Sequence, residues 1–323
     1  MIDVTIDHTH WIASDGYTTT MHLLEATAPK GVVIVFHGMM EHGARYQEFA
    51  EFLYAHHYHT IIPDVRCFGT RAQQLDSLGH LEPNHGFAQL MQDAEELVYD
   101  IKDRYPDLPI FVFGHSFGSL ISRRLGQTLG HELAGVIASG PPTDNGLLGT
   151  VSQKIVGRLI EQTSSQHPAE GLSKLIFGRY NLRFFPALSS NAWLSSDPQS
   201  VVRYDEDPLS GQTVTLGFFN ELLSATKSVN SLAYLYQHPR HLPLLLIAGE
   251  DDPVAFDGKG IHALFDAYNR VRVEGVQLTV YRGLRHELFH EFERIRIFAD
   301  IAGWLNKQIG SHPLSSLRKQ GHP

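Results

Sequence analysis

The sequence predicts an α/β protein, with a mostly parallel sheet of eight strands and helices on both of its faces. Short, continuous apolar runs such as residues 32–36 and 244–248 are typical of strands buried on both faces. Between such runs lie longer stretches with apolar residues at helical spacing, such as residues 87–104. Because strands that alternate with helices form parallel sheets, we expect functional residues at the carboxyl ends of the strands.

The individual elements follow from local patterns. Two extended segments, residues 4–11 and 18–26, are joined through Ser14-Asp15-Gly16, which is typical of a turn. The later strands are apolar runs, expected at residues 32–36, 60–62, 110–113, 135–138, 244–248 and 276–281. The main helices are expected at residues 46–56, 87–104, 119–129, 218–236, 261–268 and 292–305.

The alternation of strands and helices stops after the sixth predicted strand. Apolar residues at helical spacing near residues 151–160 predict one amphipathic helix, and the aromatic residues beyond it have irregular spacing. We interpret residues 141–215 as a cap inserted into a core formed by residues 1–140 and 216–310, followed by a loose tail at residues 311–323. A separate small domain is the alternative, but it would have few residues for a core.

Composition and charge bear on the partners. The 323 residues are 42% hydrophobic and 19% charged, with a formal net charge of −9, which is ordinary for a soluble globular protein. The chain has no Lys/Arg-rich run, so no nucleic-acid partner is expected. The acidic balance and the lack of an apolar run of membrane-spanning length predict no stable membrane anchor, and transient membrane contact by the cap is left open.

Cysteine content bears on the compartment. Cys67 is the single cysteine, so an intramolecular disulfide is impossible and a cytoplasmic location is expected. The first residues lack the basic and apolar regions of a signal peptide. The motifs predict no cofactor and no metal, and they do not predict an oligomeric state.

The most informative motif is Gly114-His115-Ser116-Phe117-Gly118, a Gly-x-Ser-x-Gly pentad between a predicted strand and a predicted helix. Its glycines allow a cramped turn that would expose the Ser116 hydroxyl at the edge of the sheet. Ser116 is therefore a candidate nucleophile. The alternative is a simple connecting turn, because glycine and serine both favour turns.

A serine nucleophile needs a base and a carboxylate that orients the base. After a strand-turn-helix of this kind, the acid and then the histidine follow the serine along the chain. Asp251 and Asp252 follow the seventh predicted strand, and His286 follows the eighth. Pro253 holds the backbone before it extended, which favours Asp252 as the acid. A solvated acidic turn is the alternative for this segment.

The tetrahedral intermediate of such a reaction needs hydrogen-bond donors for its oxyanion. The backbone N–H of Phe117, directly after the nucleophile, is one candidate. The Met39 N–H is the other, in a loop after the third strand where Gly38 allows close approach of the backbone. An arbitrary loop that contains glycine is the alternative.

Together these motifs resemble the α/β-hydrolase superfamily, from the N-terminal hairpin to the last helix. Within it, the chain is similar to the monoacylglycerol lipase and bacterial lysophospholipase group, often labelled serine aminopeptidase-like. The matching motifs are H-G-x-x-E-H-x-x-R-Y at residues 37–46, G-H-S-x-G at 114–118, G-x-x-D-x-V at 249–254, and Arg285-His286-Glu287. The resemblance implies a serine hydrolase that cleaves hydrophobic acyl esters, with Ser116, Asp252 and His286 as its catalytic residues.

The resemblance also bears on the cap. Tyr204, Asp207, Pro208 and Gly211 look like the end of the group's cap, whereas Cys67 stands where glycine is common and is interpreted as a small residue that fits. Candidates for sheltering an acyl chain are Leu147, Leu148, Phe177, Phe184, Phe185, Trp193, Phe218 and Phe219. The same side chains would equally serve as the core of the cap.

The motifs leave three alternative functions. A peptidase or an acyltransferase would use the same serine, because water and other acceptors can release the same acyl-enzyme. A ligand-binding protein on a hydrolase scaffold would bind without turnover. A zinc enzyme is the third, because residues 286–290 read H-E-x-x-H. That motif needs both histidines on one helix and a third ligand.

Overall fold

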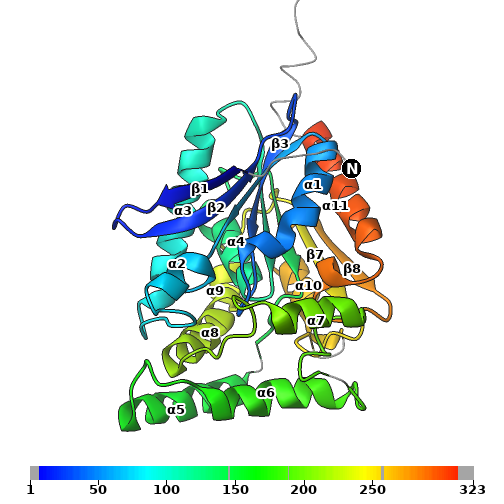
Figure 1. The fold of residues 1–323 in the computed structure, drawn as a ribbon. Coiled ribbons are helices and arrows are strands. Elements are labelled where there is room, and N and C mark those ends of the chain that lie inside the picture. The colour runs from blue at the N-terminus through cyan, green and yellow to red at the C-terminus, as the bar shows by residue number, and fades with distance from the viewer. Residues whose placement is uncertain (1–6, 145, 188, 256–257, 312–323) are drawn as a thin grey trace, which may run out of the picture.

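A single sheet of eight strands runs through the molecule, as the sequence predicts (Figure 1). The computed structural model describes residues 7–144, 146–187, 189–255 and 258–311. The strands are β1 (Asp7–Ile12), β2 (Thr18–Leu24), β3 (Gly31–Phe36), β4 (Tyr58–Pro63), β5 (Ile110–His115), β6 (Gly135–Ser139), β7 (Leu244–Gly249) and β8 (Val276–Tyr281). Their order across the sheet is β1-β2-β4-β3-β5-β6-β7-β8. Strand β2 is antiparallel to both of its neighbours, and the other pairs are parallel.

Alternate residues of the central strands pack into two separate cores, one on each face of the sheet. In β3, Ile34 belongs to one core and Val33 to the other. In β5, Val112 and Phe113 divide in the same way. All four side chains are fully buried. Burial on both faces explains why these strands are continuous apolar runs in the sequence.

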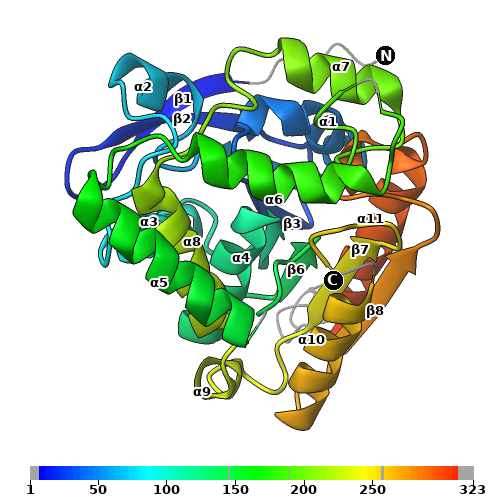
Figure 2. The ribbon, with the colours of Figure 1, turned by 90° about the horizontal axis from the view of Figure 1, so that it is seen from below.

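Helices cover both faces of the sheet (Figures 1 and 2). One face carries α1 (Gln47–Ala55) and α11 (Arg294–Ser311), where the ring centroids of Phe49 and Phe298 lie 5.0 Å apart. The other face carries α3 (Gly86–Arg104), α4 (Phe117–Thr128), α8 (Leu216–Val229) and α10 (Lys259–Arg270). The carboxyl ends of the parallel strands therefore meet at one edge, where connecting loops can form a site.

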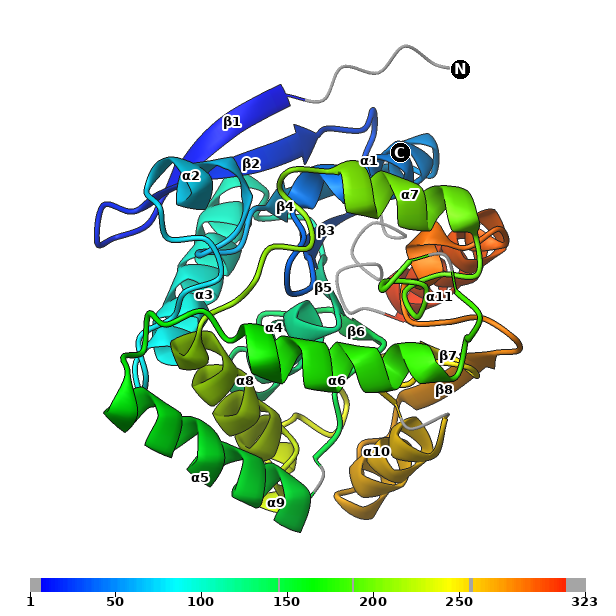
Figure 3. The same cartoon turned by 60° about the horizontal axis from the view of Figure 1, so that its bottom comes forward.

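Among its described residues, the segment between β6 and α8 contains three helices where the sequence predicts one. They are α5 (Leu147–Gln162), α6 (Glu170–Leu182) and α7 (Pro198–Glu206). The apolar residues of α6 are spread around more than half of the helix, so they do not form the one-sided stripe that predicts a helix, and none of the α6 residues is buried. Helix α7 is marked by a local signal, because the Asp197 side chain accepts from the Gln199 N–H. Helices α5 and α6 form a layer of their own beyond the strand ends (Figures 1 and 3).

Other differences from the predicted elements are local. The helix predicted at residues 218–236 is divided into α8 and α9 (Leu232–Leu235), because the Ser231 side chain caps a new helix start. A short helix, α2 (Gly69–Gln74), is not predicted. Residues 4–6 of the first predicted strand and residues 312–323 of the predicted tail lie outside the described residues. Within the described ranges, no helix combines the length and the apolar character needed to cross a membrane.

Candidate active site

Ser116 lies in a tight turn between the end of β5 and the start of α4. Its backbone has φ 49° and ψ −116°, an unusual conformation for a residue other than glycine. The turn depends on its glycines, since a Cβ on Gly114 would overlap the Gly118 carbonyl and a Cβ on Gly118 would overlap the Phe36 carbonyl. The Ser116 N–H donates to the Ser139 carbonyl at 2.8 Å, which fixes the turn on β6.

The structure brings Ser116, His286 and Asp252 into one hydrogen-bonded chain. The Ser116 hydroxyl lies 2.9 Å from His286 Nε2, and His286 Nδ1 lies 2.9 Å from Asp252 Oδ2. An ionised carboxylate only accepts hydrogen bonds, so Nδ1 carries the proton and Nε2 is free to accept from the hydroxyl. Each of the three residues lies just beyond the carboxyl end of a strand, namely β5, β8 and β7 respectively.

Of the two candidate acids, Asp252 is the one that contacts His286. Asp252 is fully buried, and its second oxygen accepts from the Val254 N–H at 2.9 Å. The Asp251 side chain is 31% exposed and pairs with Arg183, just after α6, at 2.6 Å. The geometry therefore gives Asp252 the position from which a carboxylate orients the imidazole.

The surroundings of His286 favour its protonated form. Burial lowers the pKa of His286, but the charges of Asp252, Glu287 and Glu41 and the hydrogen bond to Asp252 outweigh burial, so the pKa lies above its usual 6.5. The ring of His115 lies 4.7 Å from that of His286, and burial is the main cause that lowers the pKa of His115 to about 3. A neutral neighbour does not repel the imidazolium that forms when His286 takes a proton.

Both expected oxyanion donors are available. The backbone N–H groups of Met39 and Phe117 make no hydrogen bond to any part of the chain that the structure describes. Phe117 is the first residue of α4, where backbone N–H groups are unpaired and the helix dipole is positive. The Met39 loop packs directly on the serine turn, since a Cβ on Gly38 would meet the His115 ring at 3.1 Å.

His37 holds the peptide that carries the Met39 N–H. Its Nδ1 lies 2.8 Å from the Gly38 carbonyl, and its Nε2 accepts from the Val65 N–H at 2.8 Å. Because Nε2 accepts, the proton is on Nδ1, and burial lowers the pKa of His37, which favours this neutral ring. The Gly38 carbonyl and the Met39 N–H belong to one planar peptide and point in opposite directions. His37 therefore fixes the direction of this donor, a role that its place in the motif at residues 37–46 does not predict.

Residues 192–196, here named the strap, lie between α6 and α7 and are fastened to the loop that carries the histidine. The Arg285 guanidinium donates to the carbonyls of Ala192 and Ser195, at 2.5 and 2.9 Å. The fully buried Glu291 carboxylate accepts from the Ser195 hydroxyl at 3.2 Å. These contacts join segments about 90 residues apart, so no local sequence pattern predicts them.

Three of the predicted substrate-binding residues belong to an aromatic cluster beside the histidine. The ring centroid of Trp193 lies 5.2 Å from that of His286. Phe177 stacks parallel to Trp193 at 5.7 Å, Tyr180 lies 5.3 Å from Trp193, and Phe184 packs against the same cluster. This cluster presents an apolar wall next to His286.

The remaining predicted substrate-binding residues lie elsewhere. Phe218 and Phe219 are buried in the large core on the α8 face of the sheet. The Phe185 side chain is 83% exposed. The side chains of Leu147 and Leu148 lie outside the described residues, although their backbone belongs to α5. The structure therefore does not gather Phe185, Phe218 and Phe219 with the aromatic cluster.

The H-E-x-x-H motif does not lie on an α-helix. Residues 286–290 contain only a short 3₁₀ turn, Leu288–His290. The Glu287 carboxylate binds Arg45 at 2.7 Å, so its oxygens are engaged in an ion pair. No group of three metal-ligating side chains is placed to hold an ion in the described part of the chain.

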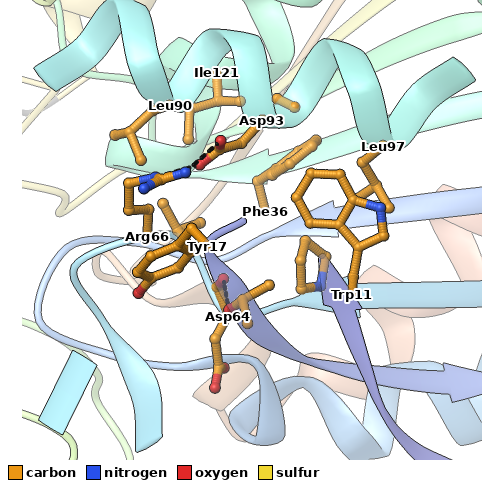
Figure 4. A pocket seen from close by; sticks show the side chains of 13 residues that line it. Trp11, Tyr17, Phe36, Asp64, Arg66, Leu90, Asp93, Leu97 and Ile121 are labelled. Atoms are coloured by element: carbon orange, nitrogen blue, oxygen red, sulfur yellow. Dashed lines mark hydrogen bonds and ion pairs between the residues drawn. The ribbon is translucent and has the colours of Figure 1, made fainter. Parts of the chain in front are cut away.

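A separate cavity of about 30 Å³ lies between the N-terminal hairpin and α3 (Figure 4). Trp11 and Tyr17 line it, and Arg66 Nε donates a hydrogen bond there to Asp93 Oδ2 at 2.6 Å. A volume of this size holds roughly one or two water molecules, so an acyl chain does not fit.

The chain is similar in sequence and in fold to known proteins. A family model described as serine aminopeptidase, S33, matches residues 27–293. The monoacylglycerol lipase of Mycolicibacterium smegmatis is 28% identical over 294 residues, which cover 86% of this chain and 89% of that protein. The phospholipase YtpA of Bacillus subtilis is 26% identical over 293 residues, which cover 88% of this chain and 98% of that protein. The solved structure of a thermostable carboxyl esterase from Bacillus coagulans, in complex with glycerol, has a TM-score of 0.86 at 24% identity and covers 94% of this chain and 99% of its own. That likeness shows the fold.

A mostly parallel sheet of this strand order, with a serine turn after β5, is the α/β-hydrolase fold, and the chain has it. It belongs to the serine aminopeptidase S33 family, whose model spans most of its length. With relatives named as lipases and a phospholipase, its class is that of carboxylic ester hydrolases.

Proposed function

We propose that the chain is a serine esterase that hydrolyses esters of hydrophobic acyl groups, of the monoacylglycerol or lysophospholipid kind. The observation that carries this proposal is the hydrogen-bonded chain from Ser116 through His286 to Asp252, beside two backbone N–H groups that have no partner among the described residues. Relatives named monoacylglycerol lipase and phospholipase support the substrate class.

In the proposed reaction, His286 Nε2 takes the hydroxyl proton as Ser116 Oγ attacks the ester carbonyl. The Asp252 carboxylate holds the Nδ1–H and stabilises the imidazolium. The N–H groups of Met39 and Phe117 bind the oxyanion of the tetrahedral intermediate. His286 then protonates the leaving alcohol as its C–O bond breaks. A water molecule, deprotonated by His286, hydrolyses the acyl-serine ester and restores the free enzyme.

We infer that residues 141–215 form a cap over this site. The aromatic cluster around Trp193 supports this inference, because it places apolar surface from this segment at His286. Solvent-exposed apolar side chains of this segment also support transient contact with a lipid aggregate. The exposed side chains are Val151 at 53%, Ile155 at 51%, Leu175 at 71%, Leu182 at 73% and Phe185 at 83%. A cytoplasmic location stays a prediction from the single cysteine.

Intact mass after treatment with a fluorophosphonate, on the wild type and on Ser116→Ala, tests the nucleophile. We expect one adduct on the wild type and none on the variant. A panel of monoacylglycerols, lysophospholipids and aminoacyl amides then tests the substrate class. Cleavage of the amides would indicate a peptidase, and transfer to an added alcohol would indicate an acyltransferase. Ligand binding without adduct or turnover would indicate a binding protein.

A further inference from the structure

Three buried charged residues join the oxyanion loop to the loop that carries the base. Arg45 donates to the two oxygens of Glu287, at 2.7 Å each, and to Glu41 Oε2 at 2.5 Å. The side chains of Arg45, Glu287 and Glu41 are 9%, 5% and 2% exposed. Arg45 thus links two carboxylates, and the three residues are named the Glu–Arg–Glu bridge.

Each end of the bridge reaches a catalytic loop. At one end, Glu41 Oε1 accepts from the Gly38 N–H at 2.5 Å, one peptide before the expected oxyanion donor. At the other end, Glu287 directly follows His286 in the chain. A displacement of Arg45 would therefore move both the oxyanion donor and the base.

The bridge also carries a net charge. Two carboxylates and one guanidinium leave one negative charge, in a place where little water screens it. Burial raises the pKa of Glu287, but the charge of Arg45 and its hydrogen bonds lower it more, to about 2. Glu41 accepts hydrogen bonds at both of its oxygens, which is the behaviour of an ionised carboxylate.

The titratable groups around His286 come from several elements. They are Asp252 after β7, His115 at the end of β5, Glu41 and Arg45 from the segment after β3, and Glu287 and His290 on the same loop. Burial is the main cause that lowers the pKa of His115 to about 3 and that of His290 to about 4, so both rings are neutral. Asp252 and the bridge therefore supply the charges that act on the imidazolium.

We propose that Glu287 is a positioning residue for the base: it ties the base to the oxyanion loop through Arg45 and Glu41, and its charge stabilises the His286 imidazolium in addition to Asp252. Glu287 acts through Arg45 and through its electrostatic field at the His286 ring, without contact with substrate. This inference rests on the proposed reaction of the serine.

The test uses Glu287→Gln, which keeps the size of the side chain and removes its charge. Glu293→Gln is the matched control, because Glu293 is on the same segment but is 50% exposed and pairs with Arg296. The measurement is kcat and kcat/KM against pH for a short-chain p-nitrophenyl ester. Wild-type kcat/KM should fall as the pH falls through the pKa of His286, since only the neutral ring accepts the serine proton.

The fall of kcat/KM on the acid side of the pH profile is here named the acid limb. We expect Glu287→Gln to shift the midpoint of the acid limb to lower pH by roughly one unit, because a nearby negative charge has been removed. Its kcat should fall more than its KM changes, and Glu293→Gln should match the wild type. An acid limb of Glu287→Gln that coincides with that of the wild type overturns the proposal, even if activity falls at every pH.

A second variant keeps the test decisive if thermal unfolding shows that Glu287→Gln does not fold. Glu41→Gln removes the other carboxylate of the bridge, so a limb shifted to lower pH supports the proposal and an unshifted limb overturns it. Failure of the proposed function is distinguishable. The wild type itself would then give neither a fluorophosphonate adduct on Ser116 nor ester turnover, which overturns both inferences.

Discussion

The Gly38 carbonyl lies 2.8 Å from Nδ1 of His37, so a neutral histidine in one tautomer directs the amide that we expect to bind the oxyanion. The second ring nitrogen is occupied by the Val65 N–H, also at 2.8 Å. Protonation of His37 would remove this acceptor. The proposed oxyanion site therefore depends on a side chain that takes no part in the reaction itself.

We expect His37→Ala to lower kcat by about 10²-fold with little change in KM, since loss of one aligned oxyanion donor costs roughly this much. Steady-state kinetics on a short-chain ester measure the effect. His131→Ala is the control, because His131 is 68% exposed. A kcat for His37→Ala equal to that of the wild type would show that the Met39 N–H is held by other contacts.

Ser116→Ala should lower turnover by about four to six orders of magnitude, and His286→Ala by a similar amount. Both side chains act as one unit with Asp252. Turnover by the double variant, Ser116→Ala with His286→Ala, should therefore be little lower than turnover by either single variant. Turnover with a saturating ester, beside the thermal midpoint of each variant, measures this. Additive losses in the double variant would contradict the proposed unit.

The two neighbouring aspartates should differ sharply. Asp252→Asn should lower kcat by about 10⁴-fold, because the amide NH₂ would donate to Nδ1 and hold His286 in the wrong tautomer. Asp251→Asn should change kcat little, because Asp251 pairs with Arg183 and is 31% exposed. Kinetics of the two variants side by side decide the assignment. The opposite ranking would show that Asp251 is the acid.

The pH dependence follows from the pKa of His286. Burial lowers this pKa, but Asp252 and the neighbouring carboxylates raise it by more than burial lowers it. The pKa of His286 therefore lies above the usual 6.5. The protonated ring cannot accept the serine proton, and kcat/KM should therefore fall as the pH falls through a midpoint above 6.5. Initial rates in buffers of constant ionic strength measure the midpoint. A midpoint well below 6.5 would contradict this account.

Gly118→Ala should destabilise the fold by about 1–3 kcal/mol, because the added Cβ would overlap the carbonyls of Phe36 and His37. Gly157→Ala in α5 is the control, since its added Cβ has no atom within 4 Å. That change should leave stability unchanged or raise it by up to about 1 kcal/mol. Denaturant midpoints compare the two, and equal midpoints would show that the serine turn tolerates a side chain.

The sheet was predictable because most of its strands are buried on both faces and appear as continuous apolar runs. Sequence pattern fails for α6, whose apolar residues are spread around more than half of the helix and none of which is buried. The helix predicted at residues 218–236 was too long, since only a serine cap marks the break between α8 and α9.

The candidate site was predictable in part. Ser116, Asp252 and His286 each follow a strand, and the ends of parallel strands share one edge of the sheet, so chain order was enough to suggest them. Arg45 and Glu287 are separated by 242 positions, and no local pattern predicts that they meet. Glu41 and Arg45 both belong to the H-G-x-x-E-H-x-x-R-Y motif, but that motif does not indicate that either residue approaches Glu287.

The strap limits which part of the chain can be exchanged between relatives. Arg285 and Glu291, from the second half of the core, bind residues 192–196. A chimaera that replaced the whole of residues 141–215 would also replace the carbonyls and hydroxyls that hold the histidine loop, whereas exchange of residues 147–182 would spare them. Exchange of α5 and α6 alone would therefore leave the contacts of the strap with Arg285 and Glu291 in place.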